Sequence, residues 1–567
     1  MNPETRTCQN CKQNFTIEPE DFNFYEKIKV PPPTWCPECR LMRRFSFTNV
    51  WELYKNSCAK CGQKVISIYS PDKPNTVYCM KCWWADDWDG TEYALDYDPS
   101  RPFLSQVKEL IAKTPWQALE VAYLTLTNSE YINASGHIKN SYLIFWADYC
   151  ENAFYSSYLN GLKDSLDCYR MVNSELCYED TGCNKCFRTF FSEECSACTD
   201  VWFSRSLTGC TNCFGCINLR NKNYWIFNEQ YSKEDYFKKL TEFNLESRRN
   251  LNQLINKVED FWAKHPRRFY EGNSLNVNVS GDYVYESKNT KNAYLVTSAE
   301  DSKFIQINSL PTTKDCYDYT GWGNNAEKIY ESAVVGEGVS NIKFSDECWP
   351  DAINIEYSIY ATACKNVFGC VNLKRKNHCI LNKEYPKEEY EKLITQIRED
   401  MKKNPYRDAS GKSYPYGEFF SMEFSPFCYN ETLAQRFFPK TKEEILEKKL
   451  TWHDKEENQY NITIKGADLP GAIKETRDSI VNEVIGCENC GKAFKITPIE
   501  LNLMRRLCFP LPEKCPNCRQ ERRFKRTNPP KLYNRTCQKC EKEIETSYAP
   551  DRPEIVYCES CYNSEIA

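Results

Sequence analysis

Cysteine pairs spaced as Cys-x-x-Cys stand at both ends of this chain, in the same order and at the same distances. Adding 479 to the number of each N-terminal cysteine gives the number of a C-terminal one. Loops of unchanged length indicate that each loop closes over a fixed geometry, as the ligands of a metal ion require. The N-terminal cysteines are Cys8, Cys11, Cys36, Cys39, Cys58, Cys61, Cys79 and Cys82, and their counterparts are Cys487, Cys490, Cys515, Cys518, Cys537, Cys540, Cys558 and Cys561.

Each end therefore holds two sets of four cysteines. The two pairs are separated by 24 residues in the first set and by 17 in the second. Two Cys-x-x-Cys turns can complete a zinc tetrahedron with zinc–sulfur distances of about 2.3 Å. Because four thiolates leave no open coordination position, we expect four structural zinc sites rather than hydrolytic ones. Iron–sulfur clusters and unliganded core cysteines are the alternatives.

The stretch "CQNCKQNFTIEPEDFNFY…PPPTWCPECRLMRR" (Cys8 to Arg44), with its partner from Cys487 to Arg523, resembles a zinc-ribbon, treble-clef-like family of uncharacterised bacterial multi-zinc proteins. The resemblance implies zinc binding by the first four cysteines of each end and no established reaction. The second set at each end lies outside this motif, and its prediction rests on spacing alone.

Positive charge is concentrated at the two ends. The net charge is −5, yet residues 1–82 carry 12 Lys and Arg against 8 Asp and Glu, and residues 487–567 carry 15 against 11, which leaves −13 for the rest. If a helix follows the second cysteine pair, its arginines share one face. Such a face suits phosphate contacts, with Phe45 and Trp51 able to stack on bases. The candidate nucleic-acid-binding residues are Arg40, Arg43, Arg44, Arg519, Arg522, Arg523 and Arg526.

Two other roles for these arginines stay open. They can pair with acidic neighbours, or they can cover the adjacent zinc site.

Between the ends, short β-prone runs recur at steps of 10 to 15 residues, from "NSYLIF" at Asn140 to "NVFGCVNL" at Asn366. A polar residue, a small one and then an aromatic or apolar one loosely open these runs, which fits a right-handed β-solenoid better than a meander or sandwich. Steps near twelve correspond to whole turns of one coil or half turns of a coil twice as long. The segments at Cys210 and Cys364 are near copies, so the body is itself duplicated.

A helix should follow each copy and cover the open end of the solenoid. We expect the first from Ser232, as N-cap, to about His265, and the second from Pro386, at the first helical position, to about Asn404. We expect a mainly β chain whose duplicated body is flanked by two treble-clef or zinc-ribbon modules. The predicted units are a double four-cysteine zinc module at 1–90, a linker and helix at 91–138, the first β-solenoid copy at 139–231, a helix at 232–270, the second copy at 271–385, a helix and packed loop at 386–479, and a second double zinc module at 480–567.

Cysteines inside the body form further Cys-x-x-Cys pairs one repeat apart. Stacked coils could bring Cys183, Cys186, Cys195 and Cys198 together as a fifth metal site. A ladder of small buried thiols is the alternative, and we favour it because Cys213 is replaced by Val367 in the second copy.

No catalytic constellation is evident. The four histidines are scattered, and no nucleotide-binding or nucleophile motif occurs. The absence of a leader or long apolar run, together with many cysteines, predicts a reducing cytoplasm without membrane contact. We predict a non-enzymatic zinc-binding scaffold that contacts RNA or DNA through the basic faces. The alternative is a protein-interaction scaffold or assembly subunit, and we rank a carbohydrate-active β-solenoid enzyme below both.

Overall fold

The structure is a computed structural model that describes residues 2–49, 51–73, 75–455 and 460–566. Strands make up most of the regular elements in these residues, and twelve α-helices accompany them. None of the described helices is long and apolar enough to cross a lipid bilayer.

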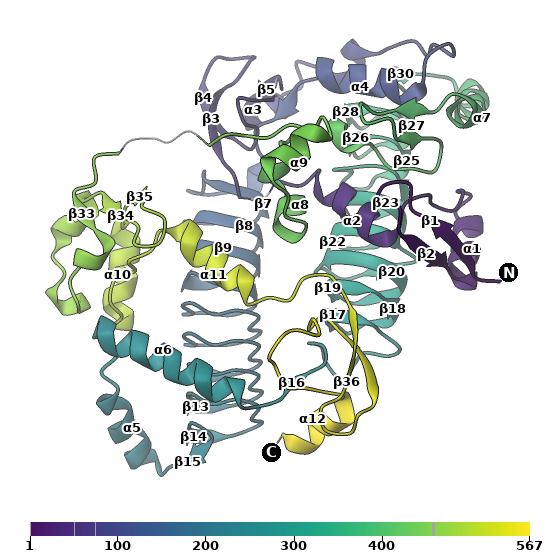
Figure 1. Cartoon of the computed structure of the whole chain (residues 1–567). Helices are drawn as coiled ribbons and strands as arrows, with labels where there is room; N and C mark the ends of the chain where they lie inside the picture. The colour runs from purple at the N-terminus through teal and green to yellow at the C-terminus, as the bar shows by residue number, and fades with distance from the viewer. Residues whose placement is uncertain (1, 50, 74, 456–459, 567) are drawn as a thin grey trace.

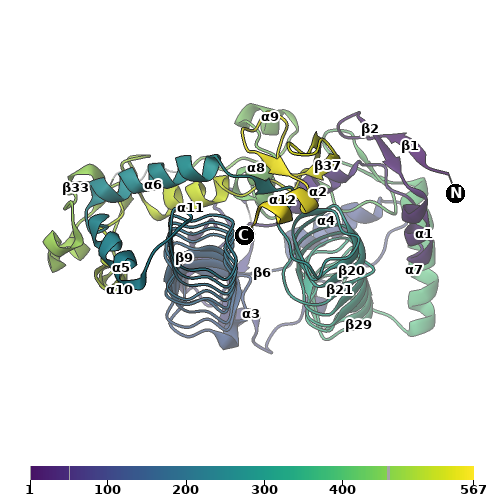
Figure 2. The same ribbon diagram turned by 90° about the horizontal axis from the view of Figure 1, so that it is seen from below.

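Two stacks of parallel coils form the body and lie side by side (Figures 1 and 2). The first stack spans residues 121–230 and the second spans residues 272–384. Figure 1 shows that they run in opposite directions, since β8 and β14 lie at opposite ends of the first stack and β27 lies near the β8 end. The strands of the first stack are β7 (Ile132–Gly136), β8 (Tyr142–Asp148), β9 (Glu151–Asn160), β10 (Lys163–Leu166), β11 (Tyr169–Val172), β12 (Thr199–Trp202), β13 (Thr211–Phe214), β14 (Asn223–Ile226) and β15 (Glu229–Gln230).

The second stack is built in the same way. Its strands are β17 (Gly281–Tyr285), β18 (Lys288–Lys291), β19 (Ala293–Thr297), β20 (Ala299–Asn308), β21 (Thr313–Lys314), β22 (Tyr317–Gly323), β23 (Ala326–Gly336), β24 (Val339–Lys343), β25 (Ile353–Glu356), β26 (Ile359–Thr362), β27 (Lys365–Phe368), β28 (Val371–Lys374), β29 (Asn377–Ile380) and β30 (Lys383–Glu384).

Strand register shows that one coil is about twelve residues long. Glu175 pairs with Phe187, and Phe187 pairs with Thr199, both in parallel. Coils of thirteen residues occur in the second stack, where Asp346 pairs with Ile359. Of the two coil lengths that the sequence left open, the structure has the shorter one.

Backbone conformation and burial repeat every three residues along the coils, a pattern that we call the three-residue rule. Between Leu176 and Asp200 every third residue has a positive φ, and the residue after it is buried. The left-handed conformation costs about 1–2 kcal/mol for a residue with a side chain. Inter-coil hydrogen bonds and a packed interior offset this cost, and small side chains fill the interior of this segment. The inner residues of this segment are Cys177, Asp180, Cys183, Cys186, Thr189, Ser192, Cys195 and Cys198.

Helices pack against the last coils of both stacks. After the first stack come α5 (Lys233–Glu242), which contacts β14, and α6 (Arg248–Ala263). The sequence predicted one continuous helix to about residue 265, but Asn244 takes a positive φ and Ser247 caps a new helix. After the second stack, α7 (Lys387–Lys403) contacts β29 over the predicted span, with Pro386 at the N-cap rather than at the first helical position.

The terminal modules dock crosswise on the stacks (Figure 2). Helix α2 (Pro37–Phe45) of the N-terminal module contacts β22 and β23 of the second stack. Helix α11 (Pro516–Lys525) of the C-terminal module contacts β9 and β11 of the first stack. The chain therefore closes on itself, because each end is held by the half of the body that is farther away in sequence.

Shorter elements complete the chain. The linker before the first stack holds α4 (Phe103–Lys113) and β6 (Trp116–Gln117), and β16 (Arg267–Arg268) precedes the second stack. Beyond α7 lie β31 (Tyr406–Arg407), β32 (Ser413–Tyr414), α8 (Leu433–Phe437), α9 (Lys442–Glu447) and β33 (Ile464–Lys465).

The inner position of Cys186, which lies among other small inner residues, should tolerate serine but not an aromatic ring. Cys186 is 2 % exposed and its amide donates to the Oγ of Ser174, the inner residue one coil earlier. We expect Cys186→Ser to change the free energy of unfolding by less than about 1.5 kcal/mol, and Cys186→Phe to lower it by about 1–3 kcal/mol through overpacking. Urea unfolding followed by circular dichroism measures both, and equal effects would contradict the three-residue rule.

Candidate metal centres

Four groups of four cysteines bring their sulfurs together, and they are the four groups that the spacing predicted. In each group all four sulfur atoms lie within 4.8 Å of one another. No further group of three or more His, Cys, Asp or Glu ligand atoms that could hold a metal meets this criterion among the described residues.

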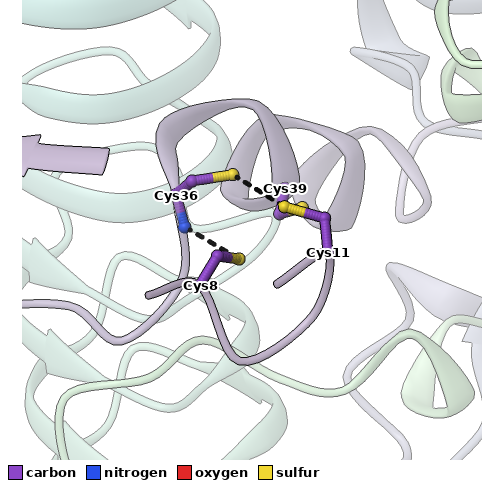
Figure 3. Close-up of side chains that lie close together, drawn as sticks. All are labelled: Cys8, Cys11, Cys36 and Cys39. Atoms are coloured by element: carbon purple, nitrogen blue, oxygen red, sulfur yellow. Dashed lines mark hydrogen bonds between the residues drawn. The ribbon is translucent and has the colours of Figure 1, made fainter. Parts of the chain in front are cut away.

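The first group joins a hairpin to the start of a helix. Strands β1 (Glu4–Thr7) and β2 (Asn14–Ile17) pair antiparallel and carry Cys8 and Cys11 in the turn between them. Cys36 is the N-cap of α2, and Cys39 lies in its first turn. Figure 3 shows the four side chains directed toward a common centre. The Cys36 amide donates to the Cys8 sulfur at 3.2 Å, and the side-chain amide of Asn10 donates to the Cys39 sulfur at 3.1 Å.

The other three groups repeat this construction. Their hairpins are β3 (Tyr54–Ser57) with β4 (Lys64–Ser67), β34 (Ile485–Gly486) with β35 (Ala493–Phe494), and β36 (Tyr533–Thr536) with β37 (Glu543–Thr546). Cys79, Cys515 and Cys558 are the N-caps of α3 (Met80–Trp83), α11 and α12 (Glu559–Glu565). Strands β5 (Val77–Tyr78) and β38 (Val556–Tyr557) precede α3 and α12.

Sulfur separations fit a single tetrahedral ion. The Cys11–Cys36, Cys61–Cys79, Cys490–Cys515 and Cys540–Cys558 sulfurs are 3.7, 3.9, 3.8 and 3.7 Å apart. Four sulfurs placed about 2.3 Å from one ion at tetrahedral angles are about 3.8 Å apart. A disulfide needs about 2.05 Å, and all of these cysteines are free.

Each group contains a thiol that the surrounding donors favour as a thiolate. Hydrogen bonding from Cys39 lowers the pKa of Cys36 to about 5. Burial opposes ionisation of Cys58 and Cys487, but backbone N–H groups of neighbouring residues lower their pKa to about 6 and about 7. The Ser560 hydroxyl lowers the pKa of Cys558 to about 6. Thiolates are the form that binds metal, so the donor sets fit a thiophilic cation.

The proposed fifth site is not formed by Cys183, Cys186, Cys195 and Cys198. These thiols donate instead to main-chain carbonyls of the next coil, as Cys186 does to Cys195 at 3.5 Å and Cys198 does to Leu207 at 3.5 Å. Burial raises the pKa of Cys183 and Cys195 well above its usual range, which keeps these thiols protonated. The internal Cys-x-x-Cys spacing reflects the three-residue rule, and the buried ladder is what the structure shows.

The candidate nucleic-acid-binding arginines of α2 lie inside the molecule. Arg40, Arg43 and Arg44 are at most 1 % exposed. Asp318 on β22 forms ion pairs with Arg40 and Arg44, with nitrogen–oxygen distances of 2.8 and 3.2 Å. Glu331 on β23 forms ion pairs with Arg44, at 2.8 Å, and with Arg43. Burial opposes ionisation of Glu331, but the three arginines outweigh it and lower its pKa.

Helix α11 repeats the arrangement on the first stack. Arg519 and Arg523 are each 2 % exposed and bind Asp167 at 2.9 and 3.1 Å, and Arg523 also reaches Glu179 at 3.2 Å. In both stacks the aspartate and the glutamate belong to successive coils. We call these two sets, Arg40 and Arg44 with Asp318 and Glu331, and Arg519 and Arg523 with Asp167 and Glu179, the arginine clamps.

The remaining two arginines are partly exposed. Arg522 pairs with Glu179 at 2.6 Å with its side chain 38 % exposed, and Arg526 pairs with Glu193 at 2.8 Å and Glu259 at 2.6 Å with 27 % exposed. The sequence left three roles open for these seven arginines. In the structure each of them pairs with an acidic side chain. Phe45 is 0 % exposed and offers no stacking face. Trp51 is partly buried, with Tyr158 beside its ring and the Arg436 guanidinium 4.4 Å from the ring centroid.

A scan against protein-family models found no match for the chain, and a search of curated proteins found no relative.

Loss of one ligand should remove one metal ion. We expect Cys39→Ser to reduce bound metal by one equivalent, because three thiolates and a hydroxyl form a poorer site for a soft cation. Cys508→Ser is the control, since Cys508 is exposed and outside all four groups. Elemental analysis of protein purified under reducing conditions measures this, and unchanged metal content in the Cys39 variant would contradict the assignment.

Removing a clamp arginine should destabilise the protein strongly. Arg44→Ala and Arg523→Ala each leave two buried carboxylates undercompensated, at a cost of about 3–5 kcal/mol. Arg188→Ala is the control, because Arg188 is 49 % exposed in its pair with Asp200 and should matter by less than about 0.5 kcal/mol. Chemical denaturation reports these differences, and a mild effect at Arg44 would argue against a buried clamp.

Proposed function

We propose that this protein is a non-enzymatic zinc-dependent scaffold whose terminal modules hold two β-solenoids side by side and whose exposed solenoid faces bind protein partners. The observation that carries the proposal is the arginine clamp: the arginines of α2 and α11 are turned inward against acidic residues of the body. In this role the modules hold the two stacks together. The long sides of the stacks remain exposed and are the surfaces that we expect partners to bind.

Zinc is the ion that the donor sets favour. Four thiolates around one centre suit a soft or borderline divalent cation, and zinc imposes no geometry beyond the tetrahedron. An iron–sulfur cluster would place several irons and sulfides between the thiolates, and sulfurs 3.7–3.9 Å apart are better matched to a single ion. A bound zinc ion would supply structural cross-linking and no open coordination position. The hairpin-to-helix layout is in line with the treble-clef resemblance.

Nucleic-acid binding is the second candidate function, because the arginines that suggested it are buried or paired with acids. It rested on seven arginines, of which five are at most 2 % exposed and all are engaged in ion pairs. Phosphate contacts through them would require the modules to leave the body, at the cost of breaking both clamps.

A groove lies between the first coils and α10 (Pro498–Leu507). This groove has a volume of about 580 Å³. An amide ladder of Asn128, Asn140 and Asn152 forms one wall, and Ile499 and Arg506 lie on the other. Glu130 and Asp164 also line the groove, so charged groups of both signs stand beside the amides and the apolar wall. An extended peptide can satisfy such groups, so we place partner binding here first.

Capture experiments with matched surface variants test the proposal. Tagged full-length protein, crosslinked and treated with nuclease, should retain protein partners that are lost in Tyr131→Ala/Ile499→Ser. The control is Tyr149→Ala/Leu446→Ser, which changes an exposed tyrosine and an exposed aliphatic residue elsewhere. Retention that disappears with nuclease, or RNA binding by the purified protein that falls steeply with salt, would favour the nucleic-acid alternative.

A further inference from the structure

The two halves of the molecule share a buried acidic junction, and only one copy of it contains cations. In each half, two acids on a coil lie near one acid on the linker that enters the other stack. The set in the first stack is Glu193, Glu194 and Glu271, and we call it the paired junction. The set in the second stack is Asp346, Glu347 and Glu120, and we call it the acid junction.

Strand register establishes these equivalences. Cys210 and Cys364 begin the near-identical segments, and counting back by coils matches Arg205 with Ile359, and Glu193 with Asp346. On the linkers, Trp116 pairs with Val77 as Arg267 pairs with Val556, 479 residues further on. Glu120 and Glu271 stand four residues after these two strand positions.

Four arginines surround the paired junction. Arg205 and Arg526 form ion pairs with Glu193, the latter at 2.8 Å, and Arg170 pairs with Glu194. Burial opposes ionisation of Glu193, but Arg205, Arg526 and Arg267 outweigh it and lower its pKa. Burial still raises the pKa of Glu194 to about 7.

Every one of these arginines is replaced at the acid junction. The equivalent positions are Ile359 for Arg205, Phe47 for Arg526, Trp116 for Arg267 and Gly321 for Arg170. Among the described residues no Lys, Arg or His forms an ion pair with Glu120, Asp346 or Glu347. These three side chains are nevertheless 8 %, 3 % and 3 % exposed.

The neighbours of the acid junction are neutral hydrogen-bonding groups. Tyr360 donates to Glu120 at 3.1 Å, Asn133 donates to the same carboxyl at 3.3 Å, and Trp349 donates to Glu347 at 3.1 Å. Tyr69, from the end of the β3–β4 hairpin, also faces the three carboxyls. Its hydroxyl, Oδ1 of Asp346 and Oε1 of Glu347 are buried without a partner.

Ionised carboxylates cannot be accommodated in such a place without a large free-energy penalty. Burial raises the pKa of Glu120 to about 7, and burial together with the neighbouring acids raises the pKa of Asp346 and Glu347 well above its usual range. The titratable groups close to this cluster are the carboxyls themselves, Tyr69, Tyr360 and the buried Cys348 thiol.

We propose that the acid junction is a proton-dependent latch, closed while its three carboxyls are protonated, that fixes the second N-terminal hairpin and the linker to the last coils of the second stack. Here the folded state binds more protons than the unfolded state, so stability is complete below the unfolded pKa near 4.5 and declines as pH rises through 7. Within the paired junction Glu193 serves as the internal reference, because, despite its burial, its arginines lower its pKa and so oppose this loss.

Neutral substitutions at equivalent positions should act in opposite directions. At pH 8 we expect Asp346→Asn/Glu347→Gln to raise the Tm and to flatten its decline between pH 5 and 8. Glu193→Gln should lower the Tm at pH 8, since it leaves Arg205 and Arg526 undercompensated. Hydrogen exchange gives a local readout: the opening equilibrium around Tyr69 should rise by up to about tenfold per pH unit for each carboxyl that ionises, relative to the variant at the same pH.

Two results would overturn the latch. One is an unchanged pH dependence of Tm and of exchange around Tyr69 in Asp346→Asn/Glu347→Gln. The other is a Tm of the wild-type protein at pH 8 that Ca²⁺ or Mg²⁺ raises and that the variant does not share, because the carboxyls would then hold a cation rather than protons.

Discussion

Guanidinium groups buried against carboxylates hold the ends of this chain to its body, and cysteine clusters hold the guanidinium groups in position. A buried ion pair stabilises a protein only where geometry satisfies both partners. The geometry here comes from α2 and α11, each of which begins at a cysteine of a four-sulfur group. Two arginines four residues apart on one helix contact an aspartate and a glutamate on successive coils. The spacing of one helical turn therefore matches the spacing between coils at each clamp.

Each terminal module docks on the stack that is farther from it in sequence, and this arrangement relates the two halves of the duplicated chain. An N-terminal module on the second stack and a C-terminal module on the first make the two halves equivalent around the line between the stacks. Neither stack is held by its sequence neighbour alone, and loss of one module would expose acidic residues of the opposite half. The two junctions occupy equivalent positions in this arrangement but differ in charge: arginines surround the paired junction, and neutral groups surround the acid junction.

Sequence reasoning found the sixteen cysteines because a metal site fixes loop lengths, and fixed lengths survive as an offset of 479 throughout. It found repeats at steps near twelve residues for a related reason, since coils must stay in register, but it left open whether one step is a whole coil or half of one. The arginines were located correctly on helices, but their partners were missed: Asp167, Glu179, Asp318 and Glu331 are distant in sequence and look like ordinary surface acids. Their spacing of one coil was the available signal. The three-residue rule was also missed, although the internal Cys-x-x-Cys pairs follow it, because the same spacing is typical of metal sites.

The most direct test of the account is hydrogen exchange of the full chain before and after a chelator removes its metal under reducing conditions. If coordination holds the clamps, α2, α11 and the strands around Asp318 and Asp167 should lose protection together, while the inner coils between Cys177 and Cys198 remain protected. Equal protection of α2 and α11 with and without metal would contradict the claim that the cysteine groups keep the arginines in place.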